Sequence, residues 1–131
     1  MDGFKKEERL CSRTLILRLI DKGSSFLLYP YRITSFETVL PSTGFPAQVL
    51  ITVSRRRFKR AVDRNRVKRV IREAYRKNKS EYLYKHLHQT GNSLALMISY
   101  VGKEILPSPE MEKKLILVLE RLQREYDRKG A

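Results

Sequence analysis

The chain has one cysteine, Cys11, among 131 residues, and it has no long apolar run. A single cysteine allows no intramolecular disulfide, which favours a reducing compartment. The longest apolar stretches, around Ile16 and Leu115, are interrupted by Arg18 and Glu120. They fall short of the roughly 18 residues that a membrane span needs. Charged residues also crowd the start of the chain, where a signal peptide needs an apolar segment. We therefore expect a cytoplasmic protein with no membrane partner.

Motifs for catalysis by protein side chains are also missing. The chain has no Gly-rich phosphate loop, no His-Glu metal motif and no Gly-x-Ser-x-Gly. His86 and His88 are the only histidines, and no Cys or carboxylate motif accompanies them, so exposed histidines are favoured over a zinc site. Cys11 has no histidine partner in the local sequence, which favours an inert thiol. The sequence therefore predicts no catalytic residue and no metal ligand.

Acidic residues are scarce relative to basic ones. The chain has 14 Asp and Glu against 28 Lys and Arg, which gives a net charge of +14. Between Arg55 and Lys79 there are thirteen basic residues and only two acidic ones, Asp63 and Glu73, so this segment carries +11 and the rest of the chain +3. Surface helices that bind no ligand usually mix the two signs. The imbalance favours nucleic-acid binding over a merely solvated basic face.

Hydrophobic periodicity predicts the order helix, strand, strand, helix, strand, helix. Ser12 suits the N-cap of the first helix and Gly23 its stop, while Ser108 and Pro109 suit the cap and first turn of the last helix. Residues 81–92 are ambiguous and extend the second helix in one interpretation. The predicted helices are 12–20, 62–78 and one starting at 108, and the predicted strands are 31–40, 48–53 and 94–100, with a turn over 41–46.

Strands with helices packed on one side form a two-layer α–β sandwich. We therefore predict an α+β fold in which three helices pack on a small sheet. The length fits one domain that spans residues 1–131.

The second helix has two distinct faces. At about 100° per residue, Val67, Val70, Ile71, Ala74 and Tyr75 fall together on an apolar face. The opposite side holds a polar and basic set, namely Asn65, Lys68, Arg69, Arg72 and Arg76, with Arg64 and Arg66 at its edges. The N-terminus of a helix also attracts phosphates, and Arg presents a planar fork that matches them.

The run from Arg60 to Arg76 closely resembles the signature of the bacterial ribonuclease P protein component. The matching core is Ala61-Val62-x-Arg64-Asn65-Arg66-x-Lys68-Arg69-x-x-Arg72-Glu73. Residues 10–23 resemble the family's first helix and glycine, and residues 48–54 the strand before its basic loop. The resemblance implies an α–β sandwich with a left-handed crossover around the basic helix.

The same resemblance implies a function. In that family a large RNA is the catalyst and the protein is its small basic subunit. The holoenzyme removes the 5′ leader of precursor tRNA by endonucleolytic hydrolysis that needs Mg²⁺, which the RNA mainly holds. We expect the catalytic RNA and precursor tRNA as partners and no obligate protein partner.

The resemblance also assigns residues. The basic helix would contact the catalytic RNA, and a cleft between the first helix and the sheet would hold the leader. The expected RNA-binding residues are Arg55, Arg56, Arg64, Asn65, Arg66, Lys68, Arg69, Arg72 and Arg76. The expected leader-cleft residues are Ile16, Ile20, Tyr31 and Ile33.

Two features depart from the family pattern. Ile16 and Ile20 stand where the family has aromatics, so they either line the cleft or only pack the core. Stacking of bases would then fall to Phe26, Tyr31 or Phe36, or be weaker. The connection over 57–60 is one residue longer than a common form, and its path is not predicted.

Two other functions compete with this one. A ribosomal or other structural RNA-binding protein would share the charge and the size. A DNA-binding module would place the basic helix in a major groove, but the sequence suggests neither a dimer helix nor a helix-turn-helix pair.

Overall fold

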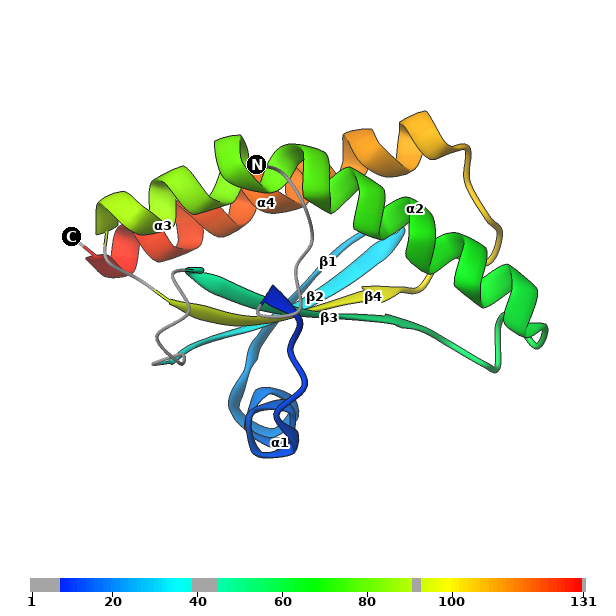
Figure 1. Ribbon diagram of the computed structural model, residues 1–131, viewed down its shortest axis with the longest axis horizontal. Helices are drawn as coiled ribbons and strands as arrows, with labels where there is room; N and C mark the ends of the chain where they lie inside the picture. Colours follow the sequence, from blue (N-terminus) through cyan, green and yellow to red (C-terminus); the bar gives the residue numbers. More distant parts are fainter. Residues whose placement is uncertain (1–7, 39–44, 91–92, 131) are drawn as a thin grey trace.

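The computed structural model describes residues 8–38, 45–90 and 93–130. Four strands and a series of helices follow one another along the chain (Figure 1). They are α1 (Arg13–Lys22), β1 (Ser24–Leu28), β2 (Tyr31–Glu37), β3 (Ala47–Val53), α2 (Ala61–Lys79), η2 (Ser80–Tyr84), α3 (Lys85–Thr90), β4 (Leu94–Tyr100) and α4 (Ser108–Gly130).

The strands form one mixed sheet in the order β1-β2-β4-β3. β1 with β2 and β2 with β4 are antiparallel, whereas β3 and β4 are parallel. Parallel neighbours need a crossover connection, and here α2, η2 and α3 supply it. In Figure 1 both strands point right, α2 lies above them and β4 lies behind β3, so the crossover is left-handed, against the usual hand. The α+β class and the left-handed crossover are confirmed.

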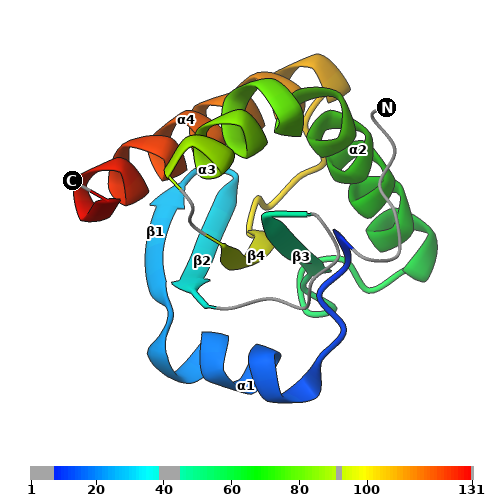
Figure 2. The same cartoon turned by 60° about the vertical axis from the view of Figure 1, so that its left-hand side comes forward.

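The helices cover the two faces of the sheet unequally. α2, α3 and α4 form a layer on one face, and α1 lies alone on the other (Figure 2). The main core fills the space under the helical layer and includes Ile33, Ile71, Leu96 and Leu115, all fully buried. The expectation that every helix packs on one side is wrong for α1. Periodicity shows that a helix has an apolar face but not which face of the sheet receives it.

Close approach at Gly23 explains how α1 reaches its face of the sheet. Leu19 is the buried residue of α1 and packs with Leu10 and Ala95 in a second, smaller core. A Cβ atom at Gly23 would lie 2.3 Å from the Leu19 carbonyl oxygen and 2.6 Å from the Thr34 Cγ2. Only glycine therefore lets the end of α1 pass so close to β2.

The ends of the helices partly match the predictions. The Leu15 amide donates to the Ser12 hydroxyl oxygen at 3.3 Å, so Ser12 is the N-cap of α1 as predicted. In α4 the Met111 amide donates to the Pro107 carbonyl at 3.0 Å. Ser108 is thus inside the helix, and the prediction of Ser108 as its cap is wrong because the chain turns one residue earlier.

The predicted strands are found, and one strand was missed. β1 is only five residues long and Pro30 follows it closely, so the sequence pattern of this segment does not predict a strand. The ambiguous stretch after Asn78 continues as helix through η2 and α3 to Thr90. The end of the predicted strand 31–40 and most of the predicted turn 41–46 lie outside the described residues, as does the end of the stretch 81–92.

A buried ionic cluster joins the N-terminal segment to the junction of α2 and η2. The Glu8 carboxylate accepts hydrogen bonds from the Lys79 ammonium and the Tyr84 hydroxyl. The Tyr75 hydroxyl donates to the Tyr84 oxygen at 3.4 Å, and the Lys79 Nζ lies 5.3 Å from the centre of the Tyr84 ring. Glu8 and Lys79 are both almost fully buried, so each charge depends on the other for compensation.

Candidate nucleic-acid interface

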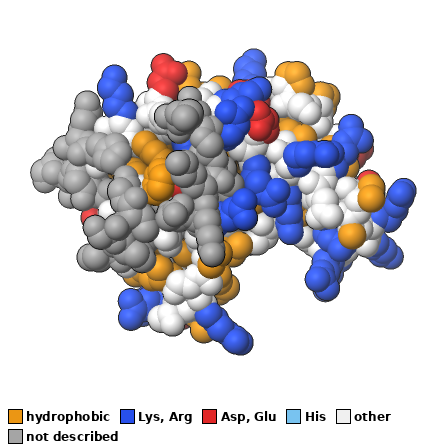
Figure 3. All heavy atoms as spheres, in the orientation of Figure 1, with side chains coloured by type: hydrophobic (Ala, Val, Ile, Leu, Met, Phe, Trp, Pro, Cys, Tyr) orange, Lys and Arg blue, Asp and Glu red, His pale blue; other side chains and the backbone are white. Residues whose placement is uncertain are grey.

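The exposed side of α2 presents the predicted cations to solvent. Val67, Ile71 and Tyr75 are fully buried against the sheet and α4, which fixes the opposite side of the helix outward. Figure 3 shows Lys and Arg side chains gathered over the end of the molecule where α2 and the loop before it lie. Asn65, Arg66, Arg69 and Arg72 are exposed, and Lys68 and Arg76 are half-buried at the margins. The structure thus brings the basic helix residues together on one surface, as predicted.

Arg64 has a different role from its neighbours. Its Nη1 donates to the carbonyl oxygens of Phe58 and Lys59, at 2.8 Å each. The guanidinium therefore fastens the preceding connection onto the first turn of α2. The sequence marked Arg64 as an RNA contact only, because hydrogen bonds to carbonyls in an irregular loop leave no sequence signal.

The basic turn at residues 55–57 follows β3 directly, and Arg55, Arg56 and Arg57 are all exposed. The Phe58 amide donates to the Ser54 carbonyl at 3.1 Å. The Phe58 ring is buried beside Tyr100, with 6.0 Å between the ring centres. The buried Phe58 ring therefore anchors the connection over residues 57–60, whose path the sequence does not predict, and it keeps the basic turn exposed.

Arg76 is partly neutralised within its own helix. Its guanidinium forms an ion pair with Glu73, with 3.2 Å between Nε and Oε2. The hydrogen bond from Arg76 lowers the pKa of the Glu73 carboxyl below its ordinary range. Arg76 therefore contributes less free charge than Arg69 or Arg72.

A hollow of about 180 Å³ gathers more cations beside β3, which is one of the two edge strands of the sheet. Lys68 and Arg72 from α2 line it together with Arg9 from the N-terminal segment. The segment is held there because the Leu10 amide donates to the Val49 carbonyl at 2.9 Å. The sequence reasoning missed Arg9, since a single bridge to an edge strand has no recognisable pattern.

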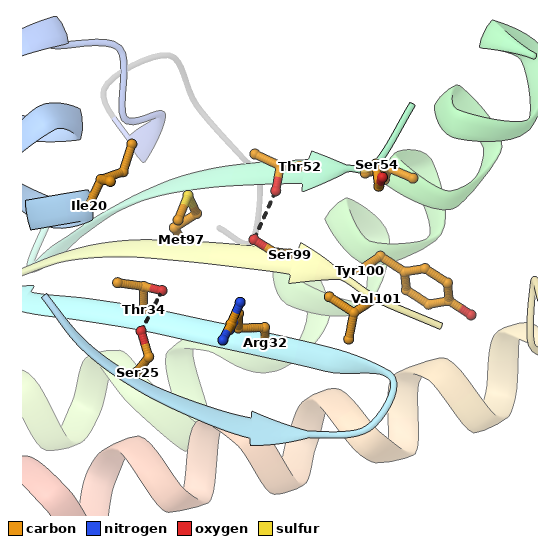
Figure 4. Close-up of a pocket in the computed structure, with 11 residues that line it drawn as sticks. Ile20, Ser25, Arg32, Thr34, Thr52, Ser54, Met97, Ser99, Tyr100 and Val101 are labelled. Atoms are coloured by element: carbon orange, nitrogen blue, oxygen red, sulfur yellow. Dashed lines mark hydrogen bonds between the residues drawn. The ribbon is translucent and has the colours of Figure 1, made fainter. Parts of the chain in front are cut away.

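A groove of about 440 Å³ lies on the other face of the sheet, beside α1 (Figure 4). Its lining combines apolar side chains with hydroxyl groups and carries little charge. The Ser25 and Thr34 hydroxyls are hydrogen-bonded at 3.0 Å, and the Thr52 hydroxyl donates to Ser99 at 2.9 Å. Ile20, which is 63% exposed, stands at the α1 end, and Ser54 lies at the other end, next to the basic turn. The groove therefore leads from the first helix to the cations.

No metal centre is visible in the part of the chain that the structure describes. Within residues 8–38, 45–90 and 93–130, no three His, Cys, Asp or Glu side chains come together to hold a metal ion. Among the same residues, none of the helices combines the length and the apolar character needed to cross a bilayer.

Comparison with known proteins decides the family. The family model for ribonuclease P matches residues 4–123. The chain belongs to the ribonuclease P protein family. Membership implies an RNA partner and a part in tRNA processing.

Relatives in the ribonuclease P family span almost the whole chain. A ribonuclease P protein component of Geotalea uraniireducens is 40% identical over 125 residues, covering 93% of this chain and 96% of the relative. One from Porphyromonas gingivalis is 35% identical over 121 residues, covering 88% and 86%.

Solved structures of ribonuclease P proteins share the fold. The protein from Thermotoga maritima superposes with a TM-score of 0.69 at 22% identity, covering 87% of this chain and 96% of that one. The Staphylococcus aureus protein gives a TM-score of 0.68 at 18% identity, covering 88% and 94%. The α+β architecture is therefore that of known ribonuclease P proteins.

The structure corrects half of the expected leader cleft. Tyr31 and Ile33 are fully buried on the helical face of the sheet, and the Tyr31 hydroxyl donates to the Met111 carbonyl of α4 at 2.9 Å. Successive strand residues point to opposite faces, so Arg32 and Thr34 line the groove instead. The assignment of Tyr31 and Ile33 to the cleft is therefore wrong, because their neighbours along β2 are the residues that face it.

The two isoleucines of α1 have separate roles. Ile16 is half-buried and packs against the small core of Leu10, Leu19 and Ala95, whereas Ile20 lines the groove. The expected stacking aromatics do not reach the groove. Phe26 is buried with the Arg121 guanidinium 4.2 Å from its ring centre, and Phe36 packs under α1.

Proposed function

We propose that this chain is the protein subunit of ribonuclease P, which assists removal of the 5′ leader from precursor tRNA. The basic surface of α2 binds the catalytic RNA, and the groove beside α1 binds the single-stranded leader. The RNA is the catalyst, and the protein supplies no catalytic residue. The Mg²⁺ that the hydrolysis needs belongs mainly to RNA phosphates.

The observation that carries this proposal is the meeting of the two surfaces at the basic turn. Ser54 lines the groove, the next three residues are the exposed arginines of the turn, and α2 begins at Ala61. One RNA on α2 and a second strand in the groove would therefore approach each other there. Two polyanions repel, and the local charge of the turn lowers that repulsion.

Reconstitution tests the proposal. Purified protein is mixed with transcribed ribonuclease P RNA from the same organism and precursor tRNAs with leaders of several lengths, at low Mg²⁺. We expect cleavage at the mature 5′ end to depend on the protein, and binding to tighten with leader length up to a plateau. Equal tightening of precursor and mature tRNA would contradict the leader groove. RNA binding without any effect on cleavage would instead support a structural RNA-binding protein.

Arg72 tests the basic surface separately. Arg72→Ala removes an exposed cation of α2, so we expect weaker binding to the catalytic RNA and a salt slope smaller by roughly 0.7 to 0.9. Arg124→Ala is the matched control, because Arg124 is also exposed but lies on α4. Equal losses in the two variants would mean that diffuse charge, and not this surface, binds the RNA.

A further inference from the structure

A second hollow, of about 340 Å³, adjoins the groove on the α1 face of the sheet. It shares Arg32 and Val101 with the groove, so the two are continuous. Leu27 and Tyr29, at the tip of the β1–β2 hairpin, form one side. Arg57 of the basic turn and Lys103 of the loop after β4 form the other side. A strand that follows the groove away from α1 therefore reaches this hollow.

Tyr29 is the one aromatic side chain among the described residues that line the hollow. It is 53% exposed, and its hydroxyl oxygen accepts a hydrogen bond from the Lys103 amide at 3.3 Å. The bond holds the ring in place while much of its surface stays open. Tyr100 also borders the groove, but its ring is buried against Tyr31 and Phe58.

The surroundings of Tyr29 combine apolar surface with charge of one sign. Leu27 is 62% exposed and Val101 is half-buried, while the three charged residues of the lining, Arg32, Arg57 and Lys103, are all basic. One exposed tyrosine on a surface needs no explanation. An exposed ring with apolar neighbours and cations around it matches a nucleotide, whose base stacks while its phosphates meet the cations.

We propose that Tyr29 forms a stacking subsite for one unpaired base of single-stranded RNA at the end of the groove far from α1. Arg57 and Lys103 contact the phosphates on either side of that base. The inference rests on the proposed function, since the strand that reaches the subsite is the leader lying in the groove. Tyr29 thereby takes the stacking role that Ile16 and Ile20 cannot perform.

A leader-length series with Tyr29 variants tests the subsite. Holoenzyme with wild-type protein, Tyr29→Leu or Tyr29→Phe is titrated with precursor tRNAs whose leaders grow one nucleotide at a time. We expect Tyr29→Leu to lose roughly ten-fold in affinity once the leader is long enough to reach the hollow, and nothing with shorter leaders. Tyr29→Phe keeps the ring and should retain most of the affinity. Leu117→Ala, an exposed apolar residue of α4, is the control and should match the wild type.

An abasic scan of the leader locates the base. Removing one base at a time should reveal a single position whose loss weakens wild-type binding but not binding by Tyr29→Leu. Equal binding of all leaders by the wild type and Tyr29→Leu, with longer leaders still favoured, would overturn the subsite and leave the groove. A loss that is the same at every leader length, or the same in Tyr29→Phe as in Tyr29→Leu, would also overturn it. A wild-type holoenzyme indifferent to leader length would refute the proposed function itself.

Discussion

At the scale of single residues, Arg64 differs from the other cations of α2 because its charge also organises the backbone. Two carbonyl oxygens of the loop share its Nη1. Lysine carries the same charge, but its ammonium ends a shorter side chain and does not occupy the position of that Nη1 between the two oxygens. Position within the motif therefore does not reveal which side chain is directed to solvent and which one holds the loop.

Conservative replacement separates these roles. We expect Arg64→Lys to lower the free energy of unfolding by about 0.5–1.5 kcal/mol and to weaken RNA binding, because the connection after the basic turn loses its hydrogen bonds to α2. Arg69→Lys keeps an exposed charge and should change the stability by less than about 0.5 kcal/mol. Urea unfolding and RNA titration of both variants measure this. Identical behaviour of the two variants would show that the carbonyl contacts are dispensable.

For β2, the sequence predicts the strand but not which face of the sheet each residue occupies. β2 was predicted, and its alternation distinguishes Tyr31 and Ile33 from Arg32 and Thr34. Alternation alone cannot tell which set faces α4 and which faces α1, because that depends on contacts distant in sequence. The stacking role proposed for Tyr29 was not predicted either, since it depends on Arg57 and Lys103 converging from separate loops.

At the scale of elements, α2 was the most predictable part of the chain. Its apolar residues recur with the helical period, and its motif fixes many positions at once. The helical residues after α2 were harder to predict from the sequence, because η2 is a π-helical turn that shifts the 3.6-residue hydrophobic period. The ionic cluster of Glu8 and Lys79 lies at this shift, where the N-terminal segment meets α2.

Removal of one partner should expose the importance of that cluster. Glu8→Ala leaves the Lys79 ammonium buried without its counter-charge, so we expect a loss of about 3–5 kcal/mol in unfolding free energy. The double variant Glu8→Leu with Lys79→Met should recover much of this loss, because no buried charge remains. Chemical denaturation of the three proteins tests the expectation. A double variant no more stable than Glu8→Ala would mean that the ion pair itself stabilises the junction.

At the scale of the whole molecule, tyrosines supply much of the core under the helical layer. Burial raises the pKa of Tyr31, Tyr75 and Tyr84 above the ordinary value of 10.0. The folded protein then keeps protons that the unfolded chain releases above pH 10. Stability is therefore fully present below pH 10 and falls above it, by about 1.4 kcal/mol per pH unit for each such tyrosine.

Alkaline titration checks this prediction. We expect cooperative unfolding above pH 10, with phenolate absorbance of the buried tyrosines rising together with the loss of helical circular dichroism. Tyr31→Phe removes one of these groups, and its unfolding midpoint should lie at higher pH if the lost hydrogen bond to Met111 costs little at neutral pH. Gradual phenolate formation by a protein that remains folded would contradict the expected coupling.

The low charge of the groove lining has a consequence for how the protein tells its two ligands apart. Arg32 is the only charged residue among the described lining residues. Under the proposed function, the arginines and lysines of α2 bind the catalytic RNA and would therefore act on the complexes with precursor and mature tRNA alike. Ions in the medium weaken the shared attraction and largely cancel from the ratio of the two affinities. Under the proposed function, a change in the ionic strength of the cell would therefore change how much RNA the protein binds. For leaders that end within the groove, the preference for unprocessed over finished tRNA would stay nearly constant. Leaders long enough to reach Arg57 and Lys103 would make that preference fall with salt, and parallel salt titrations with leaders of both lengths would measure this.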